Sequence, residues 1–280
     1  MRSYVVLDVF TDAPLEGNSV AVFTDGAGLS DELMQRTARE MNLSETVFLL
    51  PGENGADARA RIFTPTAELP FAGHPVLGTA FLLGERLQKP VVRLQTGAGT
   101  IPIELERAGD RVTFGEMQQP IPVQEPFEAA AELLEALSVE RSRLPVTAYR
   151  NGPLHVYVAL WSDAEVAALR PDAAALTDIA DSFGVSCFAV SEIGVKTRMF
   201  APALGVNEDP ATGSAAGPLA VHLVKHGEIG FGQRVEIRQG AEIGRPSLLY
   251  ARVEGTAAEI ERVLVGGSAV LVAEGSYRLT

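Results

Sequence analysis

The chain has 280 residues, of which 46% are hydrophobic and 21% are charged, a composition typical of a globular protein with a sizeable core. Its formal charge of −13 argues against nucleic acid or an anionic membrane surface as a partner. The single cysteine, Cys187, excludes a disulfide framework and a zinc site built from the cysteines of one chain. The chain contains no apolar stretch near the roughly 18 residues needed to span a bilayer, and its apolar N-terminal run is too short for a signal peptide. We therefore expect a soluble, cytoplasmic protein.

The first half of the chain alternates strand-like and helix-like stretches. Alternating apolar residues predict a strand over 19–23, a helix is predicted over 29–41, and a strand again over 44–50. The segment 75–87, "PVLGTAFLLGERL", is apolar around most of its circumference, so we expect a buried helix with strands around it. Pro75 suits the first position of that helix, where its missing N–H has no partner to lose.

The second half repeats this order of elements. A strand-like stretch begins at His155, a helical stretch at Asp172 and another strand at Ser186. Each half then contains a related motif, "RIFTPTAELPFAGHP" from Arg61 and "RMFAPALGVNEDPATGS" from Arg198, with a linker three residues longer in the second copy. The matched pairs are Glu68 and Glu208, Pro70 and Pro210, Gly73 and Gly213, and His74 and Ser214. After an apolar segment, both halves share a glutamine and a Gly-Ala pair, so we infer two homologous halves.

This repeat predicts an α+β fold of two pseudo-symmetric halves, each a strongly curved, mostly antiparallel sheet wrapped around a central helix. We expect an N-terminal half over 1–122 and a C-terminal half over 123–280, with a last strand near 268–280 that crosses back to the first half. The proline-rich junction over 118–127 suits a linker. Ligands often bind at domain interfaces, so we expect the active site in the cleft between the halves.

The two central helices offer backbone N–H groups at their N-termini. Residues 72–74 and 212–214 precede or begin these helices, where unpaired N–H groups and the helix dipole favour an anion. His74 and Ser214 stand beside glycines at these ends, and we expect His74 to act as a donor that holds the substrate. The sequence leaves open that both residues are only turn and cap residues.

Residues that differ between the halves are candidates for directional chemistry. Glu45 falls opposite Cys187 in the sequence repeat, and Asp209 falls opposite Leu69. A carboxylate in an apolar strand is expensive to bury, so Glu45 should line a polar cavity, although it could also cap a turn or face solvent. Asp209 could be only an Asp-Pro turn residue, and Cys187 suits a core position. If Glu45, Asp209 and the two motif residues converge, they suit proton abstraction and return at carbon.

Other chemistries lack their sequence signatures. The chain contains neither a Gly-x-Ser-x-Gly nucleophile elbow nor a Gly-x-Gly-x-x-Gly or phosphate-loop pattern. The stretches "PLEGNSVAVF", "AREMNLSETVF", "FAGHPVLGTA", "EDPATGSAAGPLA" and "QGAEIGRPSL" instead resemble the phenazine-biosynthesis isomerases of the PhzF type, within the diaminopimelate-epimerase-like fold. The resemblance covers essentially the whole chain.

The resemblance implies a homodimeric isomerase that uses no cofactor and no metal. Its substrate would be a small anionic cyclic amino acid, trans-2,3-dihydro-3-hydroxyanthranilate, in which a hydrogen moves from C3 to C1 before the enol product tautomerises to an amino-ketone. Carried over to this chain, the family's general acid/base is Glu45. The substrate-contacting positions that it implies are Gly73, His74, Asp209, Gly213 and Ser214.

Two features qualify this resemblance. Ser19 stands where the family usually has proline, a departure expected to touch a turn and not the site. The epimerases of the same fold work with a pair of cysteines, which a single Cys187 does not provide. Two alternatives stay open: a racemase, isomerase or lyase of this family acting on another small amino or hydroxy acid, and a non-catalytic organic-anion binder.

Overall fold

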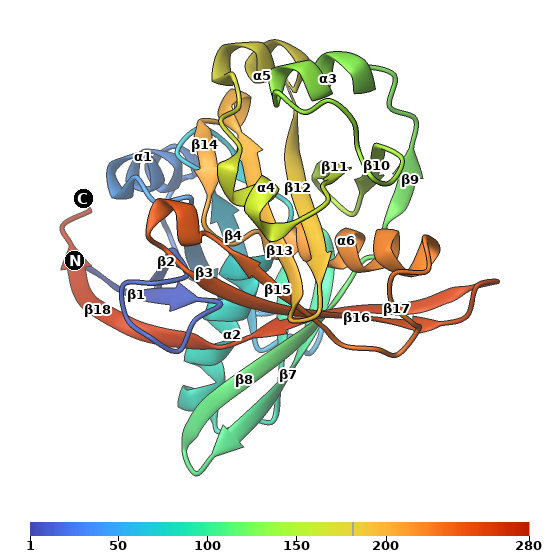
Figure 1. The fold of residues 1–280 in the computed structure, drawn as a ribbon. Helices are drawn as coiled ribbons and strands as arrows, with labels where there is room; N and C mark the ends of the chain where they lie inside the picture. The colour runs from blue at the N-terminus through green and yellow to red at the C-terminus, as the bar shows by residue number, and fades with distance from the viewer. Residues whose placement is uncertain (181, 280) are drawn as a thin grey trace. The chain divides into compact units, whose positions relative to one another are not determined.

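The computed structural model describes residues 1–180 and 182–279 of the chain (Figure 1). Its Cα positions group into two compact units. Unit 1 comprises Met1–Gln118 and Gly266–Thr280, and unit 2 comprises Gln119–Val265. Each unit has its own set of paired strands and its own buried helix, and each is described separately below.

Unit 1 is built on a mixed sheet in which antiparallel pairs predominate. β1 (Arg2–Val9) pairs antiparallel with β2 (Asn18–Phe23) and, on its other edge, with β18 (Ala269–Tyr277). β2 runs parallel to β3 (Glu45–Leu50), which pairs antiparallel with β4 (Ala58–Phe63). β4 pairs with the short β5 (Glu68–Leu69) and runs parallel to β6 (Val91–Thr96). β7 (Gly99–Ala108) and β8 (Arg111–Gln119) extend the sheet as an antiparallel ladder.

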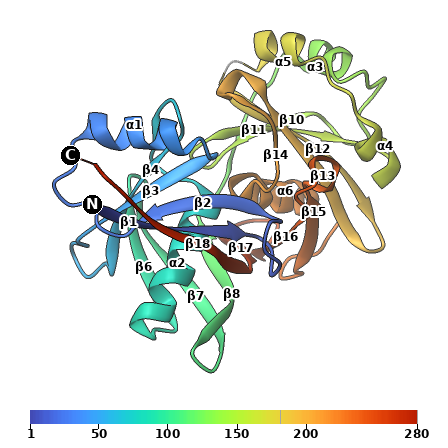
Figure 2. The same ribbon diagram turned by 90° about the vertical axis from the view of Figure 1, so that its left-hand side faces the viewer.

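The helix α2 (Gly73–Leu87) lies against this sheet and is the buried helix expected from the sequence (Figure 2). It packs on β1, β2, β3, β6, β7 and β18. Gly78 permits this close approach, because a Cβ there would lie 2.8 Å from Val9 Cγ2 and 3.0 Å from Val20 Cγ1. A helix that is apolar on all sides is stable only when other elements cover it, and here the strands of unit 1 do so.

The amphipathic helix α1 (Asp31–Met41) joins the parallel strands β2 and β3. Ser30 caps its N-terminus, with the Leu33 N–H donating to Ser30 Oγ at 3.2 Å. Its apolar face, including Met34, packs on a cluster that contains Phe23 and Phe48. The helix therefore serves as the crossover that a parallel strand pair requires.

Unit 2 repeats the same order of pairings. β11 (Leu154–Ala159) runs parallel to β12 (Phe183–Ser191), which pairs antiparallel with β13 (Gly194–Ala201). β13 pairs with the short β14 (Val206–Asp209) and runs parallel to β15 (Val235–Gln239), which pairs antiparallel with β16 (Ser247–Gly255). The strands β9 (Val123–Glu125) and β10 (Thr147–Arg150) extend the other edge, and β17 (Ile260–Gly267) follows β16. The helices are α3 (Ala130–Ala136), α4 (Asp163–Ala168), α5 (Ala173–Ile179) and α6 (Gly213–Lys225), with short turns η1 (Pro202–Leu204) and η2 (Ala241–Ile243).

The pairings confirm the predicted fold class. In both units a parallel pair, an antiparallel hairpin, a short strand, a buried helix and a second parallel pair follow in the same order. In α6, as in α2, most residues are buried, including every residue from Gly213 to Val224. The repeat in the sequence therefore corresponds to a repeat in topology.

The junction between the repeats contains a strand as well as loop. β9 lies inside the stretch expected to be a linker and pairs with β10, so this part of the junction belongs to the sheet of unit 2. The strand begins directly after Pro122, since proline has no N–H to give to a ladder. The last strand, β18, lies in unit 1 on the edge of β1, and Thr280 of the expected terminal strand lies outside the described residues.

Candidate active site

Glu45 and His74 face each other in unit 1. Glu45 is the first residue of β3, and His74 is the second residue of α2. Oε2 of Glu45 lies 3.3 Å from Nε2 of His74, and the two side chains are 15% and 5% exposed. The carboxyl group predicted to move a proton is thus almost enclosed and in contact with the imidazole of the first motif.

Burial keeps the His74 ring neutral. Desolvation lowers the pKa of His74 to about 3, and a hydrogen bond with the backbone of Ser19 acts in the opposite direction. A hydrogen bond that raises a histidine pKa is one that the ring donates. Because Nε2 makes no hydrogen bond, this donor is Nδ1, and Nε2 carries the lone pair.

This tautomer corrects the expectation that His74 acts as a hydrogen-bond donor. Its N–H is already engaged with Ser19, so the nitrogen that faces Glu45 is an acceptor. Sequence reasoning missed this because the strand residue that fixes the ring lies far away in the chain. When Glu45 holds a proton, its O–H can donate to Nε2, and when it has lost the proton the two lone pairs face each other. The pair is therefore suited to a carboxyl group that takes up and returns a proton.

Ser19 belongs to the site and not to a turn. It is the second residue of β2, and its hydroxyl donates to Oδ1 of the buried Asp8 at 2.6 Å. Through its backbone it also holds the imidazole of His74. The expectation that this position touches only a turn was wrong, because the strand begins one residue earlier, at Asn18.

The first turn of α2 presents N–H groups that have no acceptor in their own helix. The helix begins at Gly73, and its N-cap residue, Ala72, has no side chain to accept from them. Pro75 is thus the third helical residue and not the first, as the sequence suggested. The consequence for the backbone is small, since N–H groups throughout the first turn lack an intrahelical partner.

In unit 2, Asp209 is fixed by neighbours that the sequence did not single out. It is the last residue of β14, and the Thr212 hydroxyl donates to its Oδ2 at 2.5 Å. The Gln239 side chain donates to the Asp209 carbonyl at 2.7 Å and to Thr212 Oγ1 at 3.0 Å, and it accepts from the Thr212 N–H at 3.2 Å. The glutamine shared by both halves therefore ties down the loop that carries this carboxylate.

Ser214 is the second residue of α6, as His74 is of α2. Its hydroxyl lies 3.1 Å from Nε2 of His155, a buried residue of β11 that sequence analysis noted only as the start of a strand. The N-cap residue Thr212 makes no side-chain cap bond, so Gly213 and Ser214 present N–H groups much as Gly73 and His74 do. A histidine at an alternating position of a core strand was the available signal for this contact.

The strand registers correct the residue matched with Glu45. Glu45 lies opposite Val20 on the parallel neighbour β2, and the corresponding pairing of β12 with β11 sets Gly184 opposite His155. The hairpins agree, since Phe63 pairs with Thr46 and its counterpart in the second motif, Phe200, pairs with Val185. Gly184, and not Cys187, therefore corresponds to Glu45, because the paired residues are 17 positions apart in unit 1 and 15 apart in unit 2, a difference of two where a match with Cys187 needs five. Asp209 still corresponds to Leu69, opposite Met199 and Ile62 respectively.

Comparison with a protein family decides where this chain belongs. The model of the family described as phenazine biosynthesis-like protein, PhzC-PhzF, matches residues 7–275. The chain belongs to this family.

The relatives of the chain agree with this family over their full lengths. The trans-2,3-dihydro-3-hydroxyanthranilate isomerase of Pseudomonas aeruginosa is 54% identical, over 98% of this chain and 99% of its own. A solved PhzF-family protein of Bacillus anthracis matches with a TM-score of 0.87 and 26% identity, covering 99% of each chain. A probable proline racemase from Agrobacterium radiobacter, 13% identical, shares the fold with a TM-score of 0.71 over 100% of this chain and 94% of its own. The chain is an isomerase of the PhzC-PhzF family on the racemase-like fold.

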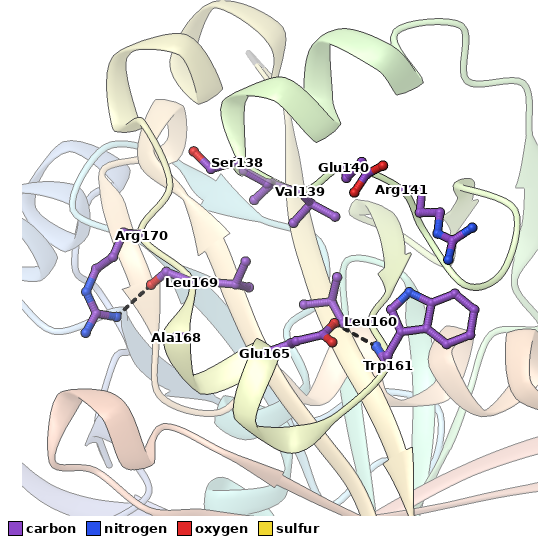
Figure 3. Close-up of a pocket in the computed structure, with 11 residues that line it drawn as sticks. Ser138, Val139, Glu140, Arg141, Leu160, Trp161, Glu165, Ala168, Leu169 and Arg170 are labelled. Carbon is purple, nitrogen blue, oxygen red and sulfur yellow. Dashed lines mark hydrogen bonds between the residues drawn. The ribbon is translucent and has the colours of Figure 1, made fainter.

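A separate pocket of about 530 Å³ opens in unit 2, and none of the predicted site residues lines it (Figure 3). Its walls combine apolar side chains such as Leu160 and Leu169 with Trp161, Arg141 and Arg170. The guanidinium of Arg141 stacks on the Trp161 ring at 5.2 Å, and Arg170 donates to the Leu169 carbonyl at 2.8 Å. These contacts engage the two guanidinium groups of the wall within the wall itself.

Two kinds of chemistry find no support in the part of the chain that the structure describes. Within residues 1–180 and 182–279, histidine, cysteine and acidic side chains form no group of three or more that could hold a metal ion. The thiol of Cys187 is buried in the core of unit 2, and burial raises its pKa to about 12, so it is not a ready nucleophile.

Among the described helices, none is both long and apolar enough to cross a membrane.

Proposed function

We propose that the chain isomerises trans-2,3-dihydro-3-hydroxyanthranilate in phenazine biosynthesis. The observation that supports this choice of substrate is the full-length similarity, at 54% identity, to the trans-2,3-dihydro-3-hydroxyanthranilate isomerase of Pseudomonas aeruginosa. The enclosed Glu45–His74 pair supports the chemistry, since a 3.3 Å contact between a carboxyl group and a neutral imidazole suits a proton shuttle.

In this proposal Glu45 is the catalytic residue. Its carboxylate takes the hydrogen from C3 of the substrate as a proton, and the electron pair left behind shifts into the ring system. The same carboxyl group then returns the proton at C1, so that substrate and product have the same composition. The resulting enol tautomerises to the amino-ketone.

His74 acts on Glu45 during this transfer. While Glu45 carries the proton, the lone pair on Nε2 accepts a hydrogen bond from it, which stabilises the acid form inside an enclosed site. The hydrogen bond from Nδ1 to Ser19 fixes the ring plane for this contact. We further propose that the His74 side chain borders the bound substrate, as the resemblance to the family implies.

The remaining residues bind and orient the substrate. Backbone N–H groups of Gly73 and Gly213, at two helix N-termini, suit the substrate carboxylate and the charge that develops in the transition state. Asp209 suits the amino group, and the Ser214 hydroxyl suits an anionic oxygen. That residues of both halves act on one substrate molecule, in a cleft between them, is the prediction made from the sequence and is part of the proposal.

The proposal extends to the working form of the enzyme. A hydrogen shift moves no electrons between molecules, so it requires no redox cofactor, and we infer that the enzyme works without cofactor or metal. By resemblance to its family we propose a homodimer in the cytoplasm that takes up a small anionic amino acid. Local donors must attract this anion, because the net charge of −13 repels it.

The direct test is incubation of the purified chain with trans-2,3-dihydro-3-hydroxyanthranilate, with the substrate absorbance followed in time. The proposal predicts disappearance of the substrate at a rate proportional to the protein concentration. Binding without turnover would identify an organic-anion binder. Neither binding nor turnover would show that the family chemistry acts on another amino or hydroxy acid.

A further inference from the structure

His155 is a buried residue of unit 2 that the mechanism above does not use. It projects from β11 toward the first turn of α6, where its Nε2 lies 3.1 Å from Ser214 Oγ. The residue is only 5% exposed. Among the described residues the Ser214 hydroxyl makes no other hydrogen bond, so His155 decides where the hydrogen of this hydroxyl points.

The surroundings of the ring favour one tautomer. Nδ1 has no hydrogen-bond partner. It faces Gly184, where an added Cβ would lie 3.2 Å from Nδ1 and 2.9 Å from Met199 Sδ. A hydrogen on Nδ1 would be a buried donor without an acceptor, which is rarer in proteins than a buried acceptor without a donor. Because desolvation lowers the pKa of His155 to about 3, the ring is neutral and carries its single hydrogen on one nitrogen only.

We propose that His155 is a positioning residue that donates its Nε2–H to Ser214 Oγ and so leaves the Ser214 hydroxyl hydrogen for an anionic oxygen of the substrate. A hydroxyl that accepts one hydrogen bond keeps its own donor, whereas one that donates to a histidine does not. The inference rests on the proposed function, because it assigns the anionic oxygen to the substrate of that same site.

The same geometry argues against an activated serine. A serine nucleophile needs a histidine whose Nε2 is a lone pair that takes the hydroxyl proton, with a third group that orients Nδ1. Here Nδ1 faces Gly184 and has no such group. The contact between Ser214 and His155 therefore orients a donor and does not create a nucleophile.

The tautomer can be read directly from the unaltered protein. The chain has four histidines, so ¹⁵N chemical shifts of the ring nitrogens of histidine-labelled protein give separable signals, and the signal lost in His155→Gln identifies this residue. The proposal predicts a hydrogen on Nε2 and a bare Nδ1. A hydrogen on Nδ1 would overturn it, whether or not the protein turns over any substrate.

Kinetics on matched variants test the consequence. The side-chain amide nitrogen of Gln reaches the position of Nε2, whereas that of Asn reaches only the position of Nδ1. We expect His155→Gln to retain most of kcat/KM and His155→Asn to lose about tenfold, the size of one hydrogen bond. In a Ser214→Ala background the Asn variant should cause no further loss.

Two results would contradict the positioning role. One is a loss of kcat/KM caused by His155→Asn that is equally large in the unaltered protein and in the Ser214→Ala background, since a general packing defect acts in both. The other is equal loss in the Gln and Asn variants. If the unaltered protein fails to turn over the substrate, the proposed function fails, while the ring tautomer still tests the role of His155.

Discussion

The position of Asp209 depends on two neighbouring side chains. The Thr212 hydroxyl and the Gln239 amide hold its side chain and its backbone, respectively. The sequence repeat singled out Asp209, Glu45 and the two helix-start residues, because they interrupt or complete a motif found twice. It could not reveal the Ser19 and His155 contacts, since they depend on strand register and on burial and not on local pattern.

A test of Asp209 at this scale replaces Thr212. Thr212→Val keeps the shape of the side chain but removes the hydroxyl that donates to Oδ2 at 2.5 Å. We expect kcat/KM to fall by about tenfold to 150-fold, because a hydrogen bond to a carboxylate contributes on the order of 1.5 to 3 kcal/mol in a site of this kind. Steady-state kinetics with Thr212→Ser as the control, which keeps the hydroxyl, checks this. Equal activity of the Val and Ser variants would show that the bond has no part in catalysis.

In each unit, a loop packs against the segment that leads into the buried helix. The sequence repeat matched these two loops with each other but did not show what they contact. A Cβ at Gly240 would lie 2.5 Å from the Pro210 carbonyl oxygen, and one at Gly97 would lie 2.9 Å from Pro70 Cα. The glycine of each shared Gly-Ala pair therefore lets a loop pack on the proline of its own motif. The sequence predicted the pairing of these residues but not its cause, which is a close backbone approach.

The helix α6 contains a proline that its surroundings compensate. Pro218 has no N–H, so the Ser214 carbonyl, four residues earlier, loses its helical partner. The Asn151 side chain donates to this carbonyl at 3.0 Å. Tyr157 donates to the neighbouring Ala215 carbonyl at 2.8 Å, although that carbonyl keeps a possible partner in the Leu219 N–H.

This compensation predicts a coupling between two substitutions. Asn151→Ala should lower the free energy of unfolding by about 1 to 2 kcal/mol, because it leaves a buried carbonyl unpaired. In a Pro218→Ala background the loss should shrink by about 1 kcal/mol, since the backbone N–H that alanine restores at this position can take over the carbonyl. Urea unfolding of the four proteins measures the coupling. Tyr157→Phe is the matched control and should show none, and equal coupling in both cycles would refute the explanation.

At the scale of the whole molecule, the repeat in sequence predicted the repeat in topology because both units use the same succession of parallel and antiparallel pairs. It matched Glu45 with Cys187 where the register gives Gly184, because the register of an alternating apolar strand against its neighbours is not written in its own sequence. The burial of three histidines, in contrast, depends on the folded molecule and could not be predicted from any local sequence pattern.

These histidines predict acid sensitivity. Burial lowers the pKa values of His74, His155 and His222 to about 3, below the ordinary value of 6.5. Between these two values the unfolded chain binds protons that the folded chain does not, so stability is lost as the pH falls from 6.5 toward 3. Each histidine contributes about 1.4 kcal/mol per pH unit in this range.

Thermal unfolding at pH 7, 6 and 5 checks this dependence. The unfolding midpoint should fall steadily below pH 6.5. His222→Gln, outside the proposed site, should reduce this dependence of the midpoint on pH by about a third, because it removes one of three equivalent contributions. A midpoint that is constant between pH 7 and 5 would show that these side chains are charged or solvated in the folded protein.

The central claim, that Glu45 carries the proton, is tested most directly by the rate of trans-2,3-dihydro-3-hydroxyanthranilate turnover in Glu45→Gln. Glutamine has nearly the same shape, and its amide can donate to the lone pair of His74 Nε2, so the variant should fold with an unfolding midpoint close to that of the unaltered protein. We predict a loss of kcat of about 100-fold to 10,000-fold, the contribution of a general acid/base. Turnover of the variant at a rate similar to that of the unaltered protein would contradict the account.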